Sequence, residues 1–220
     1  MKFDIITIFP NIFDSYLNES ILKRAQKKKL ISVRVHDLRK YSQNKHKRVD
    51  DRPFGGGPGM VLQIEPIARI FSKLRSKKQN KVIIFSASGK RFDDKSALRL
   101  AKSKNGLVML CGHYEGIDGR AKTVIKDLGF KIEEISIGPY VLTGGELPAM
   151  VMLDAVSRKI PGVLGKNESL EEQRYGVGVP AYTRPAEFTY KNKKYKVPGV
   201  LLSGNHKKIE EWRKTGKKGL

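Results

Sequence analysis

The sequence predicts an α/β protein in which helices cover both faces of a parallel sheet. Short apolar runs alternate along residues 1–160 with segments whose apolar side chains recur every three or four positions. Such alternation favours parallel strands joined by crossover helices. Glycine-rich turns follow three of the expected strands, and ligands bind at the carboxyl ends of strands in open α/β sheets. The apolar fraction of 39% is enough for a buried core.

The first elements have clear local signals. Residues 3–9 form an apolar run that predicts a strand, and apolar side chains in residues 12–25 recur at helical spacing. Residues 31–35 predict the second strand. A polar, glycine-rich stretch from residue 42 to 59 then interrupts the alternation. Pro66 marks the first turn of a helix that is expected to end near residue 76.

The alternation resumes after residue 80 and then stops. Apolar runs predict strands at 82–85, 107–111 and 132–137, and helical spacing predicts helices at 95–102, 120–128 and 147–158. Pro161 and Gly162 end the last of these helices. Residues 161–183 have no period and predict a linker or an active-site loop. Residues 184–220 predict a small, basic, mostly helical C-terminal domain, with Asn205 as the N-cap of a helix.

The charge of the chain points to a polyanionic partner. The sequence holds 44 Lys and Arg against 22 Asp and Glu, a net charge of +22. Residues 21–52, 73–104 and 191–220 each hold a large basic excess, whereas residues 105–190 are close to neutral. Solvated helix faces would account for one such segment, but three of them favour nucleic acid over a membrane surface.

Several other classes of protein are excluded. No apolar run approaches the roughly 18 residues that a membrane span needs, and Asp4 interrupts the short apolar N-terminal stretch, unlike a signal peptide. The single cysteine, Cys111, excludes an internal disulfide framework and a multi-cysteine zinc site. We therefore expect a cytoplasmic protein that has no membrane partner. We also expect no metal-binding residues.

Small-residue turns follow the strands expected at 82–85, 107–111 and 132–137. They read SASG at 86–89, GHYEG at 112–116 and GPYVLTGG at 138–145. Neither the G-x-G-x-x-G fingerprint nor a P-loop is present, which disfavours the usual dinucleotide fold and a P-loop NTPase. Glycines here would let the backbone approach a small flat ligand such as an adenosine group. Ordinary turns between strand and helix are the alternative.

Four longer motifs identify the kind of protein. Residues 50–60 read DDRPFGGGPGM, residues 112–120 GHYEGIDGR, residues 136–150 SIGPYVLTGGELPAM and residues 203–213 SGNHKKIEEWR. In this order they closely resemble the bacterial tRNA (guanine-N1)-methyltransferase family, TrmD, of the SPOUT class. The resemblance implies a C-terminal trefoil knot in the sheet domain and S-adenosyl-L-methionine bent inside it. It also implies a homodimer with its active site at the interface, acting on N1 of guanine 37, just 3′ of the anticodon in tRNA.

Carried over residue by residue, the resemblance also implies a cofactor site. Tyr114 and Glu115 would lie near the ribose and the target base, with packing and helix capping as the alternatives. Family members usually carry Asp where Pro139 stands, and Pro139 has no backbone N–H to donate. They also carry Pro-Gln where Ala87 and Ser88 stand. The implied cofactor residues are Ser86, Gly89, Gly112, Tyr114, Glu115, Gly116, Ile137, Gly138, Pro139, Tyr140, Val141, Leu142, Gly144 and Gly145.

Methylation at N1 of guanine sets a clear chemical requirement. N1 carries a proton and is a poor nucleophile, so a base must remove that proton while a cation stabilises the charge that develops on O6. The resemblance assigns the cation to Arg158. An ion pair with Asp154, four residues earlier, is the structural alternative. Glu146 and Asp118 are placed near the pocket by their motifs, or serve at helix starts.

The base is the point at which the chain departs from the family. An aspartate followed by serine stands in the family at the place that corresponds to Gln173, and glutamine cannot accept a proton at neutral pH. Glu172 is the neighbouring carboxylate, so a shift of one residue in the loop would restore a base. We hypothesise that Glu172 has this role. The alternative is that Glu172 only solvates the loop.

Two regions of the chain are expected to hold RNA. The resemblance implies contact with the tRNA anticodon stem-loop, although a surface loop without a partner is the alternative for the first region. The C-terminal part is shorter than in relatives, which leaves the range of tRNAs open. The implied RNA-binding residues are Lys47, Arg48, Asp51, Arg52, His206 and Lys207.

Two other functions stay open at this point. One is a SPOUT-class methyltransferase that acts on another RNA, although the first and last motifs disfavour it. The other is an RNA-binding protein of the same fold with impaired catalysis, which the glutamine at residue 173 suggests. A requirement for Mg²⁺ is also left open.

Overall fold

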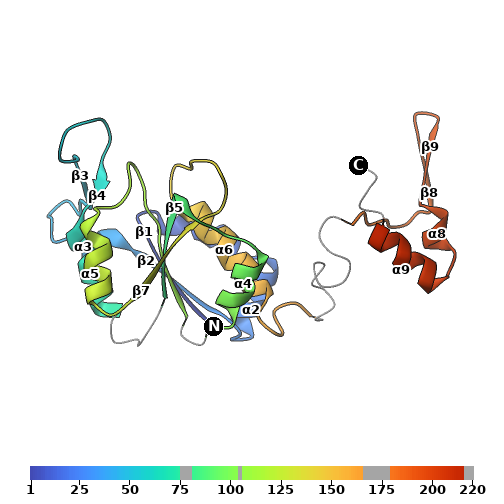
Figure 1. Ribbon diagram of the computed structural model, residues 1–220, viewed down its shortest axis with the longest axis horizontal. Coiled ribbons are helices and arrows are strands. Elements are labelled where there is room, and N and C mark those ends of the chain that lie inside the picture. Colours follow the sequence, from blue (N-terminus) through green and yellow to red (C-terminus); the bar gives the residue numbers. More distant parts are fainter. Residues whose placement is uncertain (75–80, 104–105, 166–178, 216–220) are drawn as a thin grey trace. The chain divides into compact units, whose positions relative to one another are not determined.

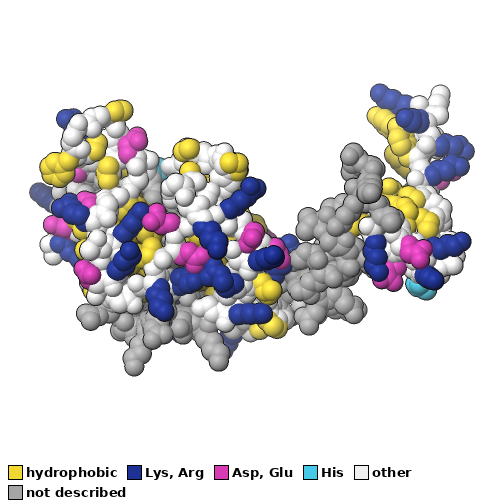
Figure 2. Space-filling view, viewed as in Figure 1, with side chains coloured by type: hydrophobic (Ala, Val, Ile, Leu, Met, Phe, Trp, Pro, Cys, Tyr) yellow, Lys and Arg dark blue, Asp and Glu magenta, His cyan; other side chains and the backbone are white. Residues whose placement is uncertain are grey.

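The computed structural model of the 220-residue chain describes residues 1–74, 81–103, 106–165 and 179–215. The chain divides into two compact units, Met1–Leu164 and Gly165–Leu220, each of which is described by itself. Most of the linker expected at 161–183 lies outside the described residues. Figure 2 shows Lys and Arg side chains on the drawn face of both units. Within the described ranges, no helix is long and apolar enough to cross a membrane.

The first unit contains a five-stranded sheet in the order β2-β1-β6-β5-β7. The strands are β1 (Lys2–Thr7), β2 (Ser32–Asp37), β5 (Lys81–Arg91), β6 (Leu107–Leu110) and β7 (Lys131–Ser136). Every neighbouring pair is parallel. The parallel sheet predicted from the sequence is therefore confirmed, and all five expected strands are present.

Helices cover both faces of this sheet, as Figure 1 shows. One face carries α2 (Ser20–Lys27), α4 (Asp94–Ala101) and α6 (Glu146–Arg158), and the other carries α3 (Ile64–Leu74) and α5 (Arg120–Asp127). Side chains of β6 alternate between two apolar clusters: Leu107 and Met109 join the first, whereas Val108 and Leu110 join the second. Because both faces are covered, the central strand β6 is apolar and buried along its whole length, whereas the edge strands β2 and β7 also carry charged side chains.

Two elements differ from the expected boundaries. The helix expected at 12–25 is divided into η1 (Pro10–Phe13), α1 (Asp14–Leu17) and α2. The Asn18 side chain donates to the carbonyl of Asp14, and Ser20 has a positive φ of 44°, so the helix cannot run through this point. Strand β5 continues past residue 85 to Arg91, with a bulge between Phe85 and Lys90.

The second unit is less helical than expected. It contains an antiparallel hairpin of β8 (Glu187–Tyr190) and β9 (Lys193–Lys196), followed by α8 (Gly199–Leu202) and α9 (His206–Thr215). The turn residues Lys191 and Asn192 have φ values of 46° and 60°, as in a two-residue type I′ turn. The side chain of Asn205 accepts from the N–H of Lys208, which confirms the expected N-cap.

The trefoil knot that the resemblance implies stays a prediction. The structure does place the loops after β6 and β7 side by side, because the N–H of Gly145 donates to the carbonyl of Gly112 at 2.8 Å. These two loops and the end of β5 meet at one edge of the sheet.

Candidate active site

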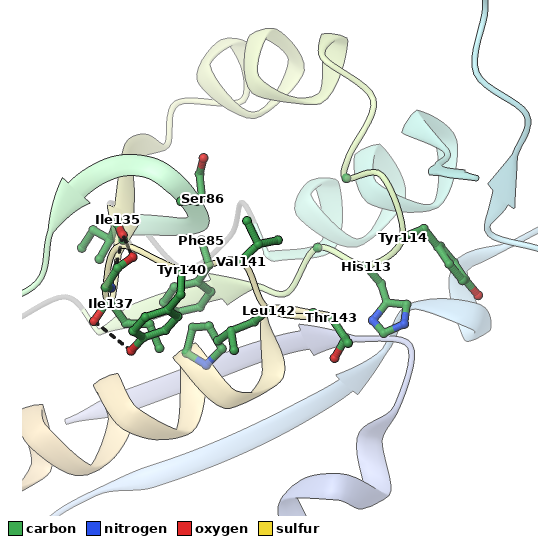
Figure 3. Close-up of a pocket in the computed structure, with 18 of the residues that line it drawn as sticks. Phe85, Ser86, His113, Tyr114, Ile135, Ile137, Tyr140, Val141, Leu142 and Thr143 are labelled. Carbon is green, nitrogen blue, oxygen red and sulfur yellow. Dashed lines mark hydrogen bonds between the residues drawn. The ribbon is translucent and has the colours of Figure 1, made fainter. Parts of the chain in front are cut away.

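A pocket of about 240 Å³ opens at the carboxyl ends of three neighbouring strands. Its walls come from the end of β5, the loop after β6 and the loop between β7 and α6, and Figure 3 shows side chains from all three. Apolar side chains such as Ile137, Leu142 and Pro148 line it together with the backbone of several glycines. The pocket therefore lies where ligands bind in open α/β sheets.

Close backbone approach joins two of these walls. Besides the hydrogen bond between Gly145 and Gly112, His113 and Gly144 form an antiparallel bridge. A Cβ atom on Gly145 would lie 2.7 Å from Cα of Cys111. Only glycine lets the start of α6 lie this close to the end of β6.

The loop between β7 and α6 also folds around a glycine near its start. The hydroxyl of Ser136 donates to the carbonyl of Gly138 at 2.8 Å, and the hydroxyl of Tyr140 donates to the carbonyl of Ile137 at 3.3 Å. Figure 3 shows the Tyr140 ring beside Ile137. A Cβ atom on Gly138 would lie 2.2 Å from this ring. The glycine thus allows the tyrosine ring to lie flat against the backbone.

The glycine-rich loop of residues 52–60 is attached to the pocket. It is closed by a short hairpin of β3 (Asp50–Asp51) and β4 (Val61–Leu62). The N–H of Glu115 donates to the carbonyl of Met60, and the N–H of Leu62 donates to the carbonyl of Gly116, both at 3.0 Å. A Cβ atom on Gly59 would lie 2.5 Å from the carboxylate of Glu115. Two motifs that are far apart in the sequence therefore form one surface.

A buried carboxylate lies beneath the pocket. Glu146 is the first residue of α6, and its carboxylate accepts a hydrogen bond from the hydroxyl of Thr7 at 2.7 Å. Its other oxygen lies 3.9 Å from Nδ1 of His113, a buried nitrogen with no hydrogen-bond partner among the described residues. Burial, and secondly the charge of Glu146, raises the pKa of Cys111 well above its usual value. Cys111 is buried and packs as a small apolar side chain.

A family model described as tRNA (Guanine-1)-methyltransferase TrmD matches residues 1–219. The chain belongs to the TrmD family. A relative from Clostridioides difficile is 48% identical over 220 residues, covering 97% of this chain and 91% of the relative. Relatives from Staphylococcus haemolyticus and Dictyoglomus turgidum are 49% and 48% identical, each covering 97% of this chain and 84% of the relative. All three carry the name tRNA (guanine-N(1)-)-methyltransferase.

The pocket gathers nearly all of the residues that the TrmD resemblance assigned to the cofactor. Gly89 and Pro139 are the exceptions. Gly89 lies in the bulge of β5, where a Cβ atom would be 2.7 Å from the backbone nitrogen of Ile135, so it serves the approach of two strands. The predicted residues that line the pocket are Ser86, Gly112, Tyr114, Glu115, Gly116, Ile137, Gly138, Tyr140, Val141, Leu142, Gly144 and Gly145.

Sequence reasoning missed several lining residues. Each of them lies within or next to one of the glycine-rich turns, and this position is the signal that could have assigned them to the pocket. The strand ends supply Phe85, Ile135 and Ser136, which were expected only as parts of strands. The missed residues are Phe85, Ala87, His113, Ile135, Ser136, Thr143 and Pro148.

The expected catalytic residues do not all meet at the pocket within one chain. Arg158 is the last residue of α6, and the pocket lies at the other end of this 13-residue helix, about 18 Å away at 1.5 Å per residue. Asp154 accepts a hydrogen bond from the hydroxyl of Tyr16 at 2.5 Å, which raises the pKa of Tyr16 to about 12. Glu172 and Gln173 lie outside the described residues.

Asp118 has the helix-start role that was its alternative. Its carboxylate accepts hydrogen bonds from the backbone N–H of Arg120 at 2.9 Å and from the Arg120 guanidinium at 2.7 and 3.0 Å, at the beginning of α5. The guanidinium is the largest cause of a lowered pKa of Asp118. Among the described residues, no group of three His, Cys, Asp or Glu side chains could hold a metal ion.

The expected RNA-binding residues occur in both units. Lys47 and Arg48 are exposed in the loop before β3. Asp51 and Arg52 line a second, larger hollow of about 800 Å³ beside the start of α3. His206 and Lys207 are exposed at the start of α9 in the other unit.

Proposed function

We propose that this chain is a tRNA (guanine-N1)-methyltransferase that transfers the methyl group of S-adenosyl-L-methionine to N1 of the guanine 3′ of the anticodon. The observation that carries the proposal is the meeting of three motif loops around one pocket, in a chain of the TrmD family. The basic charge of the chain supports a tRNA substrate. Because the proposed substrate is tRNA, we also propose that the protein acts in the cytoplasm.

The shape and lining of the pocket fit an adenosine group. Ile137 and Leu142 provide apolar surface for the faces of a purine, and the partly exposed Gly112 presents its backbone to the pocket without a side chain of its own. Glu115 places a carboxylate where ribose hydroxyls would donate. The sulfonium group of the cofactor supplies an electrophilic methyl group, so the chain needs only to place N1 in line with it.

Two side chains would handle the charges of the target guanine. Arg158 would stabilise the negative charge that develops on O6 as N1 loses its proton. Glu172 would accept that proton, because Gln173 at the family's aspartate position has no basic oxygen at neutral pH. A methylation assay with and without a chelator tests whether the reaction needs Mg²⁺.

We propose a homodimer whose active site lies at the interface. Leu147, Val151, Asp154 and Arg158 follow one another at helical spacing along a single stripe of α6. Leu147 and Val151 are about half exposed, and Tyr16, which bonds to Asp154, is similarly exposed. Exposed apolar side chains on adjacent turns of a helix favour a protein contact. A partner on this stripe would bring its own pocket close to Arg158, whereas the pocket of the same chain lies at the far end of the helix.

A complementation experiment tests the shared site. Arg158→Ala lacks the cation, and Gly145→Asp blocks the pocket because a Cβ atom there meets the backbone of Cys111. If each site uses the pocket of one chain and Arg158 of the other, mixing the two inactive variants restores activity through the heterodimer. No activity in the mixture, with heterodimers shown to form by differently tagged chains, contradicts the shared site.

The activity itself is tested with purified protein, labelled S-adenosyl-L-methionine and an unmodified tRNA transcript. Label at N1 of the guanine 3′ of the anticodon supports the proposal. Cofactor binding without any product favours the RNA-binding protein with impaired catalysis. Label on another RNA but not on tRNA favours the other SPOUT-class function.

A further inference from the structure

The hairpin of β8 and β9 presents an aromatic face that the proposed chemistry does not use. Phe188 pairs across the strands with Tyr195, and Tyr190 lies two residues from Phe188 on the same strand. Because side chains alternate along a strand and cross-strand partners share a face, these three rings lie on one face of the hairpin. Glu187, Thr189, Lys194 and Lys196 lie on the opposite face.

The three rings form one exposed surface. Phe188, Tyr190 and Tyr195 are 56%, 56% and 48% exposed. The centroid of the Phe188 ring lies 6.4 Å from that of Tyr190 with an interplanar angle of 10°, and 6.5 Å from that of Tyr195. No described residue of this unit is fully buried, so the rings are not part of a local core. A contiguous exposed patch of this kind indicates an interaction surface.

The charges around the rings indicate what kind of partner fits. The ammonium groups of Lys191 and Lys193 lie 5.6 and 5.5 Å from the centroids of the Tyr190 and Tyr195 rings. On the opposite face, Lys194 and Lys196 pair with Glu187 at 3.0 and 3.1 Å. The cations beside the rings are therefore available to a polyanion. Protein interfaces are poor in lysine at their centre, whereas proteins that bind single strands combine stacking aromatic rings with basic groups.

We propose that this aromatic face of the hairpin, formed by Phe188, Tyr190 and Tyr195, stacks on unpaired bases of the tRNA substrate. The bases of a duplex are already stacked on one another, so only bases in a loop can be splayed onto such a surface. Lys191 and Lys193 hold the adjacent phosphates. The inference rests on the proposed tRNA substrate and adds a recognition surface in the second unit.

Binding of a tRNA transcript to the full chain tests the proposal across a range of salt concentrations. Tyr190→Ala and Tyr195→Ala should each weaken binding about tenfold, the size of the loss for one stacked base. Phosphate contacts determine the slope of affinity against salt, so this slope should not change in either variant. Tyr190→Phe keeps the ring and should bind as the wild type does. Thr189→Ala, on the opposite face of the same strand, is the matched control and should also leave binding unchanged.

Two further measurements separate stacking from other roles of the rings. Binding of a fully paired RNA of similar length should be equally tight for wild type and for Tyr195→Ala. In steady-state methylation, Tyr195→Ala should raise the KM for tRNA about tenfold, because the proposed role of the ring is to bind tRNA. If the wild type neither binds nor methylates tRNA, the proposed function fails. If the wild type does both and the ring variants bind tRNA equally well, only the stacking surface is overturned. Dissociation or a lowered melting temperature in the ring variants with unchanged tRNA affinity also overturns it, in favour of a protein contact.

Discussion

Replacing Gly145 by alanine should disturb the pocket through a purely steric effect. A Cβ atom on Gly145 would lie 2.7 Å from Cα of Cys111 and 3.0 Å from the backbone nitrogen of Gly112. Neither atom can rotate away, as the end of a flexible side chain could. The φ and ψ angles of Gly145 are −83° and −3°, which alanine can adopt. The substitution therefore introduces a clash without a backbone penalty.

The size of the effect follows from the distances. Carbon atoms are in favourable contact at about 3.5–4.0 Å, so the loop after β6 and the start of α6 must separate by roughly 1 Å. Overpacking of this kind costs about 1–3 kcal/mol of unfolding free energy. The hydrogen bond between Gly145 and Gly112 lengthens at the same time. Affinity for S-adenosyl-L-methionine should fall about fivefold for each backbone hydrogen bond of about 1 kcal/mol that the displaced loop no longer makes.

Urea unfolding and calorimetric titration with the cofactor measure the two effects. Gly119→Ala is the matched control, because Gly119 has a helical φ of −56° and a Cβ atom there would meet nothing within 4 Å. The control should keep its cofactor affinity and gain about 0.4–1 kcal/mol of stability through the unfolded state. A Gly145→Ala protein with wild-type stability and cofactor affinity would refute the close approach of the two loops.

Four other substitutions test three further predictions. Thr7→Val removes the hydroxyl that donates to buried Glu146 and should lower the unfolding free energy by about 1–3 kcal/mol in urea; no loss would show that the hydrogen bond is unimportant. The pKa of Asp118 is lowered, so its ion pair stabilises the fold at neutral pH and is lost as the pH falls below about 3.9 and through the lowered value. Asp118→Asn should therefore lose less stability in acid than the wild type does, and parallel acid profiles would contradict this. In single-turnover methylation, Glu172→Gln should be impaired and Gln173→Asp active, whereas an unimpaired Glu172→Gln enzyme excludes Glu172 as the base.

The parallel sheet could be predicted because its signal is local. Apolar strands and amphipathic helices alternate, and each needs burial on a neighbour. The order β2-β1-β6-β5-β7 had no such signal, because it depends on which strands meet over long separations. The β8–β9 hairpin was missed although Phe188 and Tyr190 alternate with polar residues. The second strand is mostly lysine, so it lacks the alternation of apolar and polar residues that predicts a strand. Its turn at Lys191 and Asn192 was the available clue.

The pocket residues could be predicted only through the motifs. Spacing alone left two interpretations of the three glycine turns open, a site for a small flat ligand and ordinary turns between strand and helix, and the resemblance assigned them to one ligand. Gly89 differs because it does not line the pocket. A glycine is needed there because a Cβ atom would clash with the backbone of β7. For Arg158, the sequence contains the residue but not its distance from the pocket, which depends on the length and direction of α6. The length of α6 therefore agrees with a contribution of Arg158 from a second chain, as the interface active site implied by the resemblance requires.

The most direct test of the central claim compares two tRNA transcripts that differ at one position. One carries guanine 3′ of the anticodon and the other carries adenine there, and both are incubated with the full chain and labelled S-adenosyl-L-methionine. The account predicts that label enters only the first transcript and that nucleoside mass spectrometry identifies the product as N1-methylguanosine. Equal labelling of both transcripts, or a methyl group at any other atom, would contradict the account.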